Sequence, residues 1–451
     1  MKKRFKSCIL GVALAVAMSF SACDVSTMMT TGGKSAYEIA VENGFQGTEQ
    51  EWLLSLQGKN GQDGKNPTIE EFYTAWLEDG NEGTFSDFLK DYLQVTVSDN
   101  NDTETIQENV TSAVAVYCPF EIKSGLRTES KMYLGSGVIW ELDKETGSGY
   151  IVTNYHVVYN GDAENKICQN IGVCLYGGIL TYDSESGQFG SDTVKAEFVG
   201  GSLTYDIAVL KVEDSSVLKT REAKAVTIGN SDQMMLGEKV FTIGNPEGEG
   251  MGVTQGVVTT ESQYVELAID GKNTVDYRVL RTDAAINHGN SGGGLFNAKG
   301  ELIGIVNSKN VDKEVENMGY ALPINCVKEV IGNILDNGGK VLKARMGVTV
   351  QTTSGQSVYD QDTGKLKIVE TVTVQSVEAG YPAFGKLQQG DIVTAVEIGG
   401  VKLAVERNFQ VIDRMLALRL GDTMKITVLR NGVKREFTLV FDSKTYFTEV
   451  A

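Results

Sequence analysis

Nine short apolar runs, separated by turns rich in glycine, asparagine and aspartate, fill the middle of this 451-residue chain. They lie at residues 134–140, 150–153, 194–199, 207–212, 240–243, 253–261, 278–283, 302–307 and 320–323. Runs of this length between turn residues are typical of β-strands. The segment after Pro323 instead has the length of a helix, and it ends near Gly338. The pattern therefore predicts a mainly β fold with one terminal helix.

Three side chains beside these runs can together form a nucleophilic site. His156, one of only two histidines, follows the run that ends at 153, Asp206 precedes the run that begins at 207, and Ser291 lies between glycines. A serine hydroxyl attacks a carbonyl when a base takes its proton, and a carboxylate can fix the tautomer of that base. Each residue alone is more simply read as a core or turn residue. Together they follow the order His, Asp, Ser of chymotrypsin-like proteases, which differs from the subtilisin and α/β-hydrolase orders.

The glycine-rich turn around Ser291 also offers the donors that such a site needs. The backbone amides of Gly289 and Ser291 can converge on the oxygen that becomes negatively charged during attack. Glycine permits both the close approach and the unusual backbone angles. We therefore predict an oxyanion hole formed by Gly289 and Ser291.

The segments TNYHVV, YDIAVLKV and TDAAINHGNSGGGLFN resemble the three catalytic blocks of the HtrA family of trypsin-like serine proteases. The resemblance covers about residues 108 to 442 and implies two packed chymotrypsin-like β-barrels with the site between them. It assigns the general base to His156, the orienting carboxylate to Asp206 and the nucleophile to Ser291. It further implies an endopeptidase that works without ATP or a cofactor and assembles as a homotrimer.

Two residues of the oxyanion turn depart from the family pattern. His288 and Gly294 stand where these proteases usually carry proline. Because proline fixes φ and lowers the entropy of the free loop, its loss at both positions predicts a turn that is more mobile in the resting enzyme.

A separate alternating pattern follows Gly338 and resembles a single PDZ domain of the HtrA type at residues 344–442. The resemblance implies strand addition by a peptide whose C-terminal carboxylate is held by loop amides and whose last side chain enters an apolar pocket. The expected carboxylate loop and pocket residues are Arg345, Met346, Gly347, Val348, Ile412 and Leu416, the last two on a groove helix at 409–418. The simpler alternative is a small β-rich domain without a ligand.

Residues 1–22 have the features of a lipoprotein signal peptide. Four basic residues lie within the first six, an apolar run follows at 9–18, and small residues precede Cys23. Similarity to a lipobox implies that Cys23 is acylated and anchors the exported protein to the outer face of the bacterial cell membrane. An ordinary secretory signal with an incidental cysteine is the alternative.

The region at 23–107 is acidic and repetitive. Residues 24–110 hold 17 acidic and 4 basic side chains, which argues against binding to nucleic acid or to anionic membranes. The pattern of residues 37–53 returns at 73–89, and a glycine-rich linker at 58–66 joins the copies. Each copy is expected to form two short helices around a glycine turn and to act as a spacer or binding module.

Four cysteines remain after Cys23, at Cys118, Cys168, Cys174 and Cys326, and no pair has Cys-x-x-Cys spacing. With only two histidines in the chain, no metal site is expected. An exported protein permits a disulfide between Cys168 and Cys174, but free thiols fit the spacing equally well.

The length exceeds what one hydrophobic core usually holds, so several domains are expected. We predict a signal peptide at 1–22, acidic repeats at 23–107, a protease domain at 108–340 and a PDZ domain at 344–442. The predicted function is protein quality control, in which unfolded or exposed polypeptide segments are cleaved outside the cell membrane. The alternatives are a non-proteolytic chaperone or peptide-binding surface scaffold that keeps the protease fold, and an adhesin that binds through its repeats.

Overall fold

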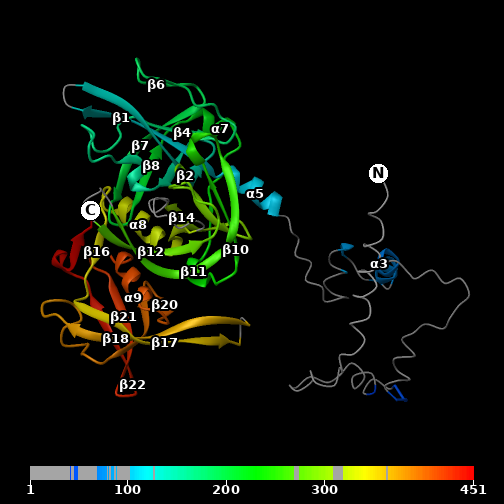
Figure 1. Ribbon diagram of the computed structural model, residues 1–451. Helices are drawn as coiled ribbons and strands as arrows, with labels where there is room; N and C mark the ends of the chain where they lie inside the picture. Colours follow the sequence, from blue (N-terminus) through cyan, green and yellow to red (C-terminus); the bar gives the residue numbers. More distant parts are fainter. Residues whose placement is uncertain are drawn as a thin grey trace, which may run out of the picture. The chain divides into compact units, whose positions relative to one another are not determined.

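The computed structural model describes residues 41, 45–48, 69–78, 80, 83–85, 88, 102–124, 127–268, 274–307, 318–361 and 364–450 (Figure 1). The chain divides into two compact units, residues 1–99 and 100–451. No helix of the described ranges is long and apolar enough to cross a membrane. The predicted signal peptide, Cys23 and the glycine-rich linker lie outside the described residues.

In the first unit, the described part of the second repeat is a helix followed by a glycine turn. Helix α3 spans Ile69–Glu78, and Gly80 and Gly83 after it have positive φ angles of 89° and 155°. Four aromatic rings pack together over this turn, at Tyr73, Trp76, Phe85 and Phe88. Tyr73 and Phe88, which are aromatic in both copies of the repeat, therefore contribute to the small core of this module together with Trp76 and Phe85.

Six strands of the second unit form a closed barrel in the order β1-β2-β3-β8-β7-β4. They span Ala113–Ser124 (β1), Arg127–Asp143 (β2), Ser148–Thr153 (β3), Ile171–Leu175 (β4), Thr193–Ser202 (β7) and Ile207–Val212 (β8). Short connecting elements lie at Tyr155–Val158 (α6), Tyr182–Asp183 (β5), Gln188–Phe189 (β6) and Ser216–Thr220 (α7). Because side chains alternate along each strand, one side chain in two points inward, and Val116, Ile151 and Leu210 are among the fully buried ones.

A second sheet has the order β13-β10-β11-β12-β15-β14-β9, and an additional β13–β14 pairing closes six of these strands into a ring. The strands span Thr227–Ile228 (β9), Lys239–Gly244 (β10), Gly252–Ala268 (β11), Thr274–Thr282 (β12), Gly294–Asn297 (β13), Glu301–Asn307 (β14) and Gly319–Pro323 (β15). Helix α8, Ile324–Asp336, follows β15 and buries its apolar face in a core to which both barrels contribute. The fold is therefore mainly β, with two barrels and a terminal helix, as the sequence predicts.

Helix α5, Asp102–Val110, begins the second unit upstream of the predicted protease boundary at 108. A Cβ added at Gly300 would lie 2.3 Å from the Asn109 side chain, so α5 packs directly against the turn between β13 and β14. Ion pairs from Asp102 to Lys239 and from Glu108 to Lys224 tie the helix to the barrels. The compact unit therefore includes residues that the sequence prediction assigned to the acidic region.

A six-stranded sheet forms the C-terminal domain, with the order β17-β18-β19-β21-β22 and β20 as a side branch that pairs with β19. The elements span Val348–Asp360 (β17), Lys365–Val377 (β18), Ile392–Ile398 (β19), Val401–Ala404 (β20), Phe409–Asp413 (α9), Thr423–Arg430 (β21) and Val433–Val440 (β22). Strands β16, Leu342–Ala344, and β23, Phe447–Glu449, pair beside it, and Figure 1 shows β17 and β18 as a long hairpin. The expected groove helix is shorter than predicted, because α9 continues only as a 3-10 turn at Arg414–Leu416.

A buried ion pair joins α9 to the second barrel. Arg278 of β12 lies 2.6 Å from Asp413, and its guanidinium stands 4.0 Å from the centroid of the Phe409 ring. The Arg278 side chain is 5% exposed, and burial raises the pKa of the Asp413 carboxyl although the guanidinium acts against it. Nearby, Asn333 of α8 donates to the backbone oxygen of Leu416. The C-terminal domain is therefore fixed to the barrel by buried polar contacts as well as by apolar ones.

Removing one partner of this ion pair should destabilise the second unit strongly. We expect Arg278→Leu to lower the free energy of unfolding by about 3–5 kcal/mol, because it leaves the Asp413 carboxylate buried without its cation. The double variant Arg278→Leu/Asp413→Leu should recover most of that loss. Urea unfolding followed by tryptophan fluorescence measures both, with Lys340→Ala, from an exposed ion pair, as the control that changes little. Equal midpoints for Arg278→Leu and Lys340→Ala would contradict the prediction.

Candidate active site

His156 lies on the short helix α6, directly after strand β3 of the first barrel. Its Nδ1 atom is 2.7 Å from Oδ2 of Asp206, and its backbone N–H donates to Oδ1 of the same carboxylate over 3.0 Å. Both carboxylate oxygens therefore hold one residue, which fixes the ring orientation and places the proton on Nδ1. Nε2 is left as the ring nitrogen that can accept a proton.

Asp206 is fully buried and has a positive φ angle of 50° at the start of β8. A buried carboxylate needs hydrogen-bond donors, and Asn307 at the end of β14 supplies one, with Nδ2 2.9 Å from Oδ2. Asn154 in turn donates to the Asp206 backbone oxygen over 2.9 Å. Neither asparagine was among the predicted site residues. The only sequence signal for Asn307 is a polar residue at the end of an otherwise apolar run.

Ser291 lies on the turn between β12 and β13, where the two barrels meet. Ser291 is 3% exposed, and its backbone oxygen accepts a hydrogen bond from the Ser136 amide of β2 over 2.8 Å. The following Gly292 has a φ angle of 87°, and its amide donates to Val306 of β14. The first barrel therefore supplies His156 and Asp206, and the second supplies the serine turn.

Hydrogen bonds also fix the part of this turn that precedes Ser291. The backbone oxygen of His288 accepts from the Glu247 amide over 2.8 Å, and that of Gly289 accepts from Ser136 Oγ over 2.6 Å. Ser136 Oγ accepts in turn from the Asn245 amide over 2.8 Å. The His288 C=O and the Gly289 N–H belong to the same trans peptide unit and point in opposite directions. Because the C=O is directed at Glu247, the Gly289 N–H faces away from Glu247. The turn thus has a defined conformation although positions 288 and 294 are not proline. The greater mobility expected in the resting enzyme stays a prediction.

Glycine is required in this turn for steric reasons. Gly289 has a φ angle of 91°, and a Cβ there would lie 2.2 Å from the backbone oxygen of Asn245. A Cβ at Gly292 would lie 2.1 Å from the backbone oxygen of Ser136. Glu247 itself adopts a φ angle of 53°, a strained conformation for a residue with a Cβ, and its amide is the one that holds His288. Gly294 begins β13 and pairs with Ile243 and Ile305.

The structure separates the predicted PDZ residues into two groups. The first group lies at the start of β17. The Arg345 guanidinium stands 4.7 Å from the centroid of the Tyr381 ring, and Met346 is buried in the domain core. Gly347 has a φ angle of 75°, and Val348 is half-buried. Ile412 instead lines a cavity of about 160 Å³ together with barrel residues. Leu416 is fully buried in the core shared with α8. In this arrangement Ile412 and Leu416 face the protease domain, so a ligand pocket built on them is not what the structure shows.

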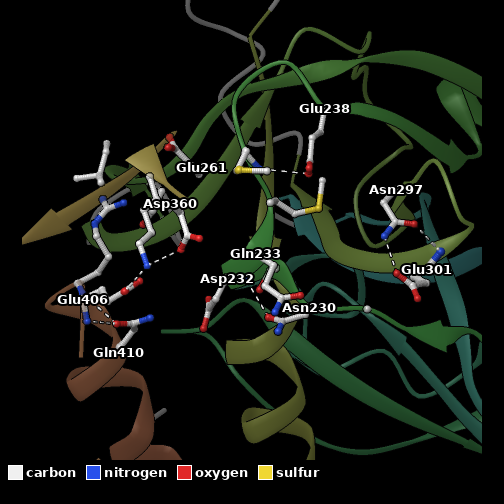
Figure 2. Close-up of a pocket in the computed structure, with 18 of the residues that line it drawn as sticks. Asn230, Asp232, Gln233, Glu238, Glu261, Asn297, Glu301, Asp360, Glu406 and Gln410 are labelled. Atoms are coloured by element: carbon white, nitrogen blue, oxygen red, sulfur yellow. Dashed lines mark hydrogen bonds and ion pairs between the residues drawn. The ribbon is translucent and has the colours of Figure 1, made fainter. Parts of the chain in front are cut away.

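A wider cleft of about 950 Å³ lies between the second barrel and the C-terminal domain (Figure 2). Its charged residues include Asp232, Glu238 and Glu301 on the barrel side. On the other side lie Asp360 and Glu406, both labelled in Figure 2. Lys367 forms ion pairs with both carboxylates. None of the residues that line this cleft belongs to the predicted triad.

The cysteines of the described ranges are all thiols, so Cys168 and Cys174 do not form a disulfide here. Burial, together with a hydrogen bond that the Cys118 thiol donates to Cys168, holds the pKa of Cys118 well above its usual range. Among the described residues no group of histidine, cysteine and acidic side chains is arranged to hold a metal ion.

The chain matches the family model of the trypsin-like peptidase domain over residues 135–305 and that of the PDZ domain over residues 344–440. Together with the two barrels, these matches define a trypsin-like serine endopeptidase with a C-terminal PDZ domain. The chain is 33% identical over 320 residues to the serine protease Do-like HtrA of Lactococcus lactis subsp. cremoris, which covers 68% of this chain and 70% of that protein. It is 31% identical over 388 residues to the serine protease Do-like HtrB of Bacillus subtilis. That alignment covers 84% of this chain and 75% of the Bacillus protein. The chain therefore belongs to the HtrA family of serine proteases.

A similar solved structure is that of the HtrA-type protease AlgW with a tripeptide. It is 27% identical with a TM-score of 0.47, and the alignment covers 75% of this chain and 95% of that chain.

Proposed function

We propose that this serine endopeptidase cleaves unfolded or exposed polypeptide segments through an acyl-enzyme formed on Ser291. The observation that carries the proposal is the hydrogen-bonded series Asn307, Asp206 and His156 beside the glycine turn of Ser291. A buried carboxylate that orients a histidine is the arrangement that activates a serine hydroxyl. An extended substrate segment is required, because a folded chain cannot enter a site between two barrels.

In the proposed reaction His156 Nε2 removes the proton from Ser291 Oγ while Oγ attacks the substrate carbonyl. Asp206 stabilises the imidazolium that forms and keeps its own charge. The amides of Gly289 and Ser291 stabilise the oxyanion. His156 then gives the proton to the leaving amine, and a water molecule, activated by the same histidine, hydrolyses the acyl-enzyme.

The location and assembly in this proposal come from the sequence. The charged and apolar segments before Cys23 support export and a lipid anchor on the outer face of the cell membrane. Such a protease would remove misfolded proteins there, which is the quality-control role we propose. The HtrA-type PDZ domain supports recognition of C-terminal peptides, with Arg345 to Val348 as the carboxylate loop, and family membership supports a homotrimer.

Labelling with a fluorophosphonate probe tests the function directly. We expect stoichiometric modification of Ser291, located by mass spectrometry of the peptide that contains it, because only an activated serine reacts quickly with this probe. The same preparation should cleave an unfolded protein at mapped sites. If the folded protein neither reacts with the probe nor cleaves, the non-proteolytic chaperone or scaffold function would replace the proposal.

A further inference from the structure

A pocket of about 460 Å³ borders the oxyanion turn and takes no part in the reaction proposed above. Residues 131–134 of β2 form one wall, and Glu247, His288 and Gly289 form the other. It therefore lies between the two barrels and immediately beside the position where the scissile carbonyl is expected. We call it the leaving-side pocket, for the reason given below.

The alternation of side chains along β2 identifies which of them face this pocket. Ser136 contacts Gly289 and Asn245, so its face of the strand is directed at the oxyanion turn. Met132 and Leu134 lie two and four residues before Ser136 and therefore share that face. A Cβ added at Gly248 would be 2.4 Å from a methyl group of Leu134, which confirms that Leu134 reaches the Glu247 loop.

The apolar side of the pocket is held in place although it is open to solvent. Leu134 is 37% exposed. On the opposite face of β2, the Tyr133 ring packs edge-to-face on buried Phe120, with 5.3 Å between the centroids, which holds this part of the strand in place. Met132 packs on the small core that contains Tyr117. An exposed apolar surface that is already ordered favours binding, since little side-chain entropy is lost when a ligand covers it.

The position of His156 shows which part of a substrate reaches this pocket. A Cβ added at Gly135 would lie 2.6 Å from Val157, so this part of β2 lies against the helix that carries His156. The histidine protonates the leaving amine, and the chain that follows the scissile bond therefore leaves on this side. Strand β15 contributes no residue to this pocket.

Alternation within the substrate identifies the residue more closely. In an extended chain, side chains two positions apart point in the same direction. The second residue after the scissile bond therefore points the same way as the residue before the bond, toward the side of the second barrel. His288, Gly289 and Glu247 of that barrel form a wall of the leaving-side pocket.

We propose that the leaving-side pocket binds a bulky apolar side chain, such as leucine, at the second residue after the scissile bond, and that Leu134 determines this preference. The inference rests on the proposed acyl-enzyme function and adds a specificity that the triad does not supply. Met132 and Leu134 supply the apolar contact in this pocket. Lys131 and Glu247, which also line it, have polar side chains that suit the polar backbone of a bound peptide.

Acyl transfer to added amines tests the pocket separately from acylation. The wild-type enzyme is acylated with a peptide ester, and the amides Gly-Leu-NH2 and Gly-Gly-NH2 compete for the acyl group. The amine nitrogen bonds to the acyl carbon, the bond from that carbon to Ser291 Oγ breaks, and the amine proton passes through His156 to Oγ. We expect about tenfold more Gly-Leu product, because burial of part of a leucine side chain favours binding to this degree. Leu-Gly-NH2, with the side chain one position earlier, should show a smaller preference.

Leu134→Ala should reduce the Gly-Leu preference to about twofold or less, and Leu134→Met should retain most of it. Because both amines compete for one acyl-enzyme, the ratio does not depend on how much enzyme is active. Tyr176→Ala, on a 63% exposed side chain outside the pocket, is the matched control and should leave the ratio unchanged. An equal ratio in the wild type, or an unchanged preference in Leu134→Ala, would overturn the inference. Absence of an acyl-enzyme would instead contradict the proposed function.

Discussion

Ser291→Ala should lower kcat for cleavage of an unfolded substrate by about 10⁶-fold. The change removes only Oγ, the atom that forms the acyl-enzyme. Alanine fits the site, because Ser291 is buried and the hydrogen bond from Ser136 reaches its backbone oxygen, which the variant keeps. The measurement is the initial rate of release of fluorescent fragments from a labelled unfolded protein. Unfolding by urea should be close to that of the wild type.

Ser186→Ala is the matched control for this loss. Ser186 is an exposed serine whose hydroxyl bonds the neighbouring Asp183 in the turn between β5 and β6. Its removal should change kcat by less than twofold. Cleavage by Ser291→Ala at more than a small fraction of the wild-type rate, at the same peptide bonds, would show that another group is the nucleophile.

Much of the barrel could be predicted from the sequence, because its strands are short apolar runs between turn residues. All nine predicted runs overlap observed strands. Strand β1 was not predicted, and Pro119 within it is the kind of residue that argues against a strand. Strand β1 pairs with β4 over Val114 to Tyr117, whereas at Pro119 its one strand partner among the described residues is β2. The N–H that proline lacks therefore costs no ladder hydrogen bond on the side of β1 that faces away from β2.

The contact between His156 and Asp206 could be predicted because each residue lies in a recognisable segment, whereas the residues that support the site could not. Asn307 is 101 residues from Asp206, and Ser136 is 153 residues from Gly289. No local pattern links residues so far apart, since their contact depends on how the two barrels dock. Leu416 shows the opposite difficulty. Its apolar character fitted a ligand pocket, but a short helix with two apolar faces does not reveal which face meets another domain.

Asp206→Asn should lower kcat by about 10⁴-fold, with a smaller effect on the fold than removal of the side chain would have. An asparagine in place of the carboxylate presents an N–H₂ group to His156 Nδ1, which favours the tautomer with the proton on Nε2, where it cannot accept the serine proton. The backbone is expected to tolerate the change, because asparagine adopts the left-handed region of the φ angle of 50° more readily than most residues. Single-turnover labelling by a fluorophosphonate should slow in parallel with kcat.

Asp214→Asn is the control, because Asp214 is also an aspartate with a positive φ angle, 47°, that begins a turn of the same barrel. Its side chain is 85% exposed and pairs with Lys219, away from the triad. The same chemical change should therefore leave kcat within twofold of the wild type. If Asp206→Asn lost activity only in proportion to a loss of folded protein, measured by urea unfolding, the carboxylate would have a structural role alone. If both variants kept full activity, His156 would not depend on Asp206 for its tautomer, and the proposed mechanism would fail at that step.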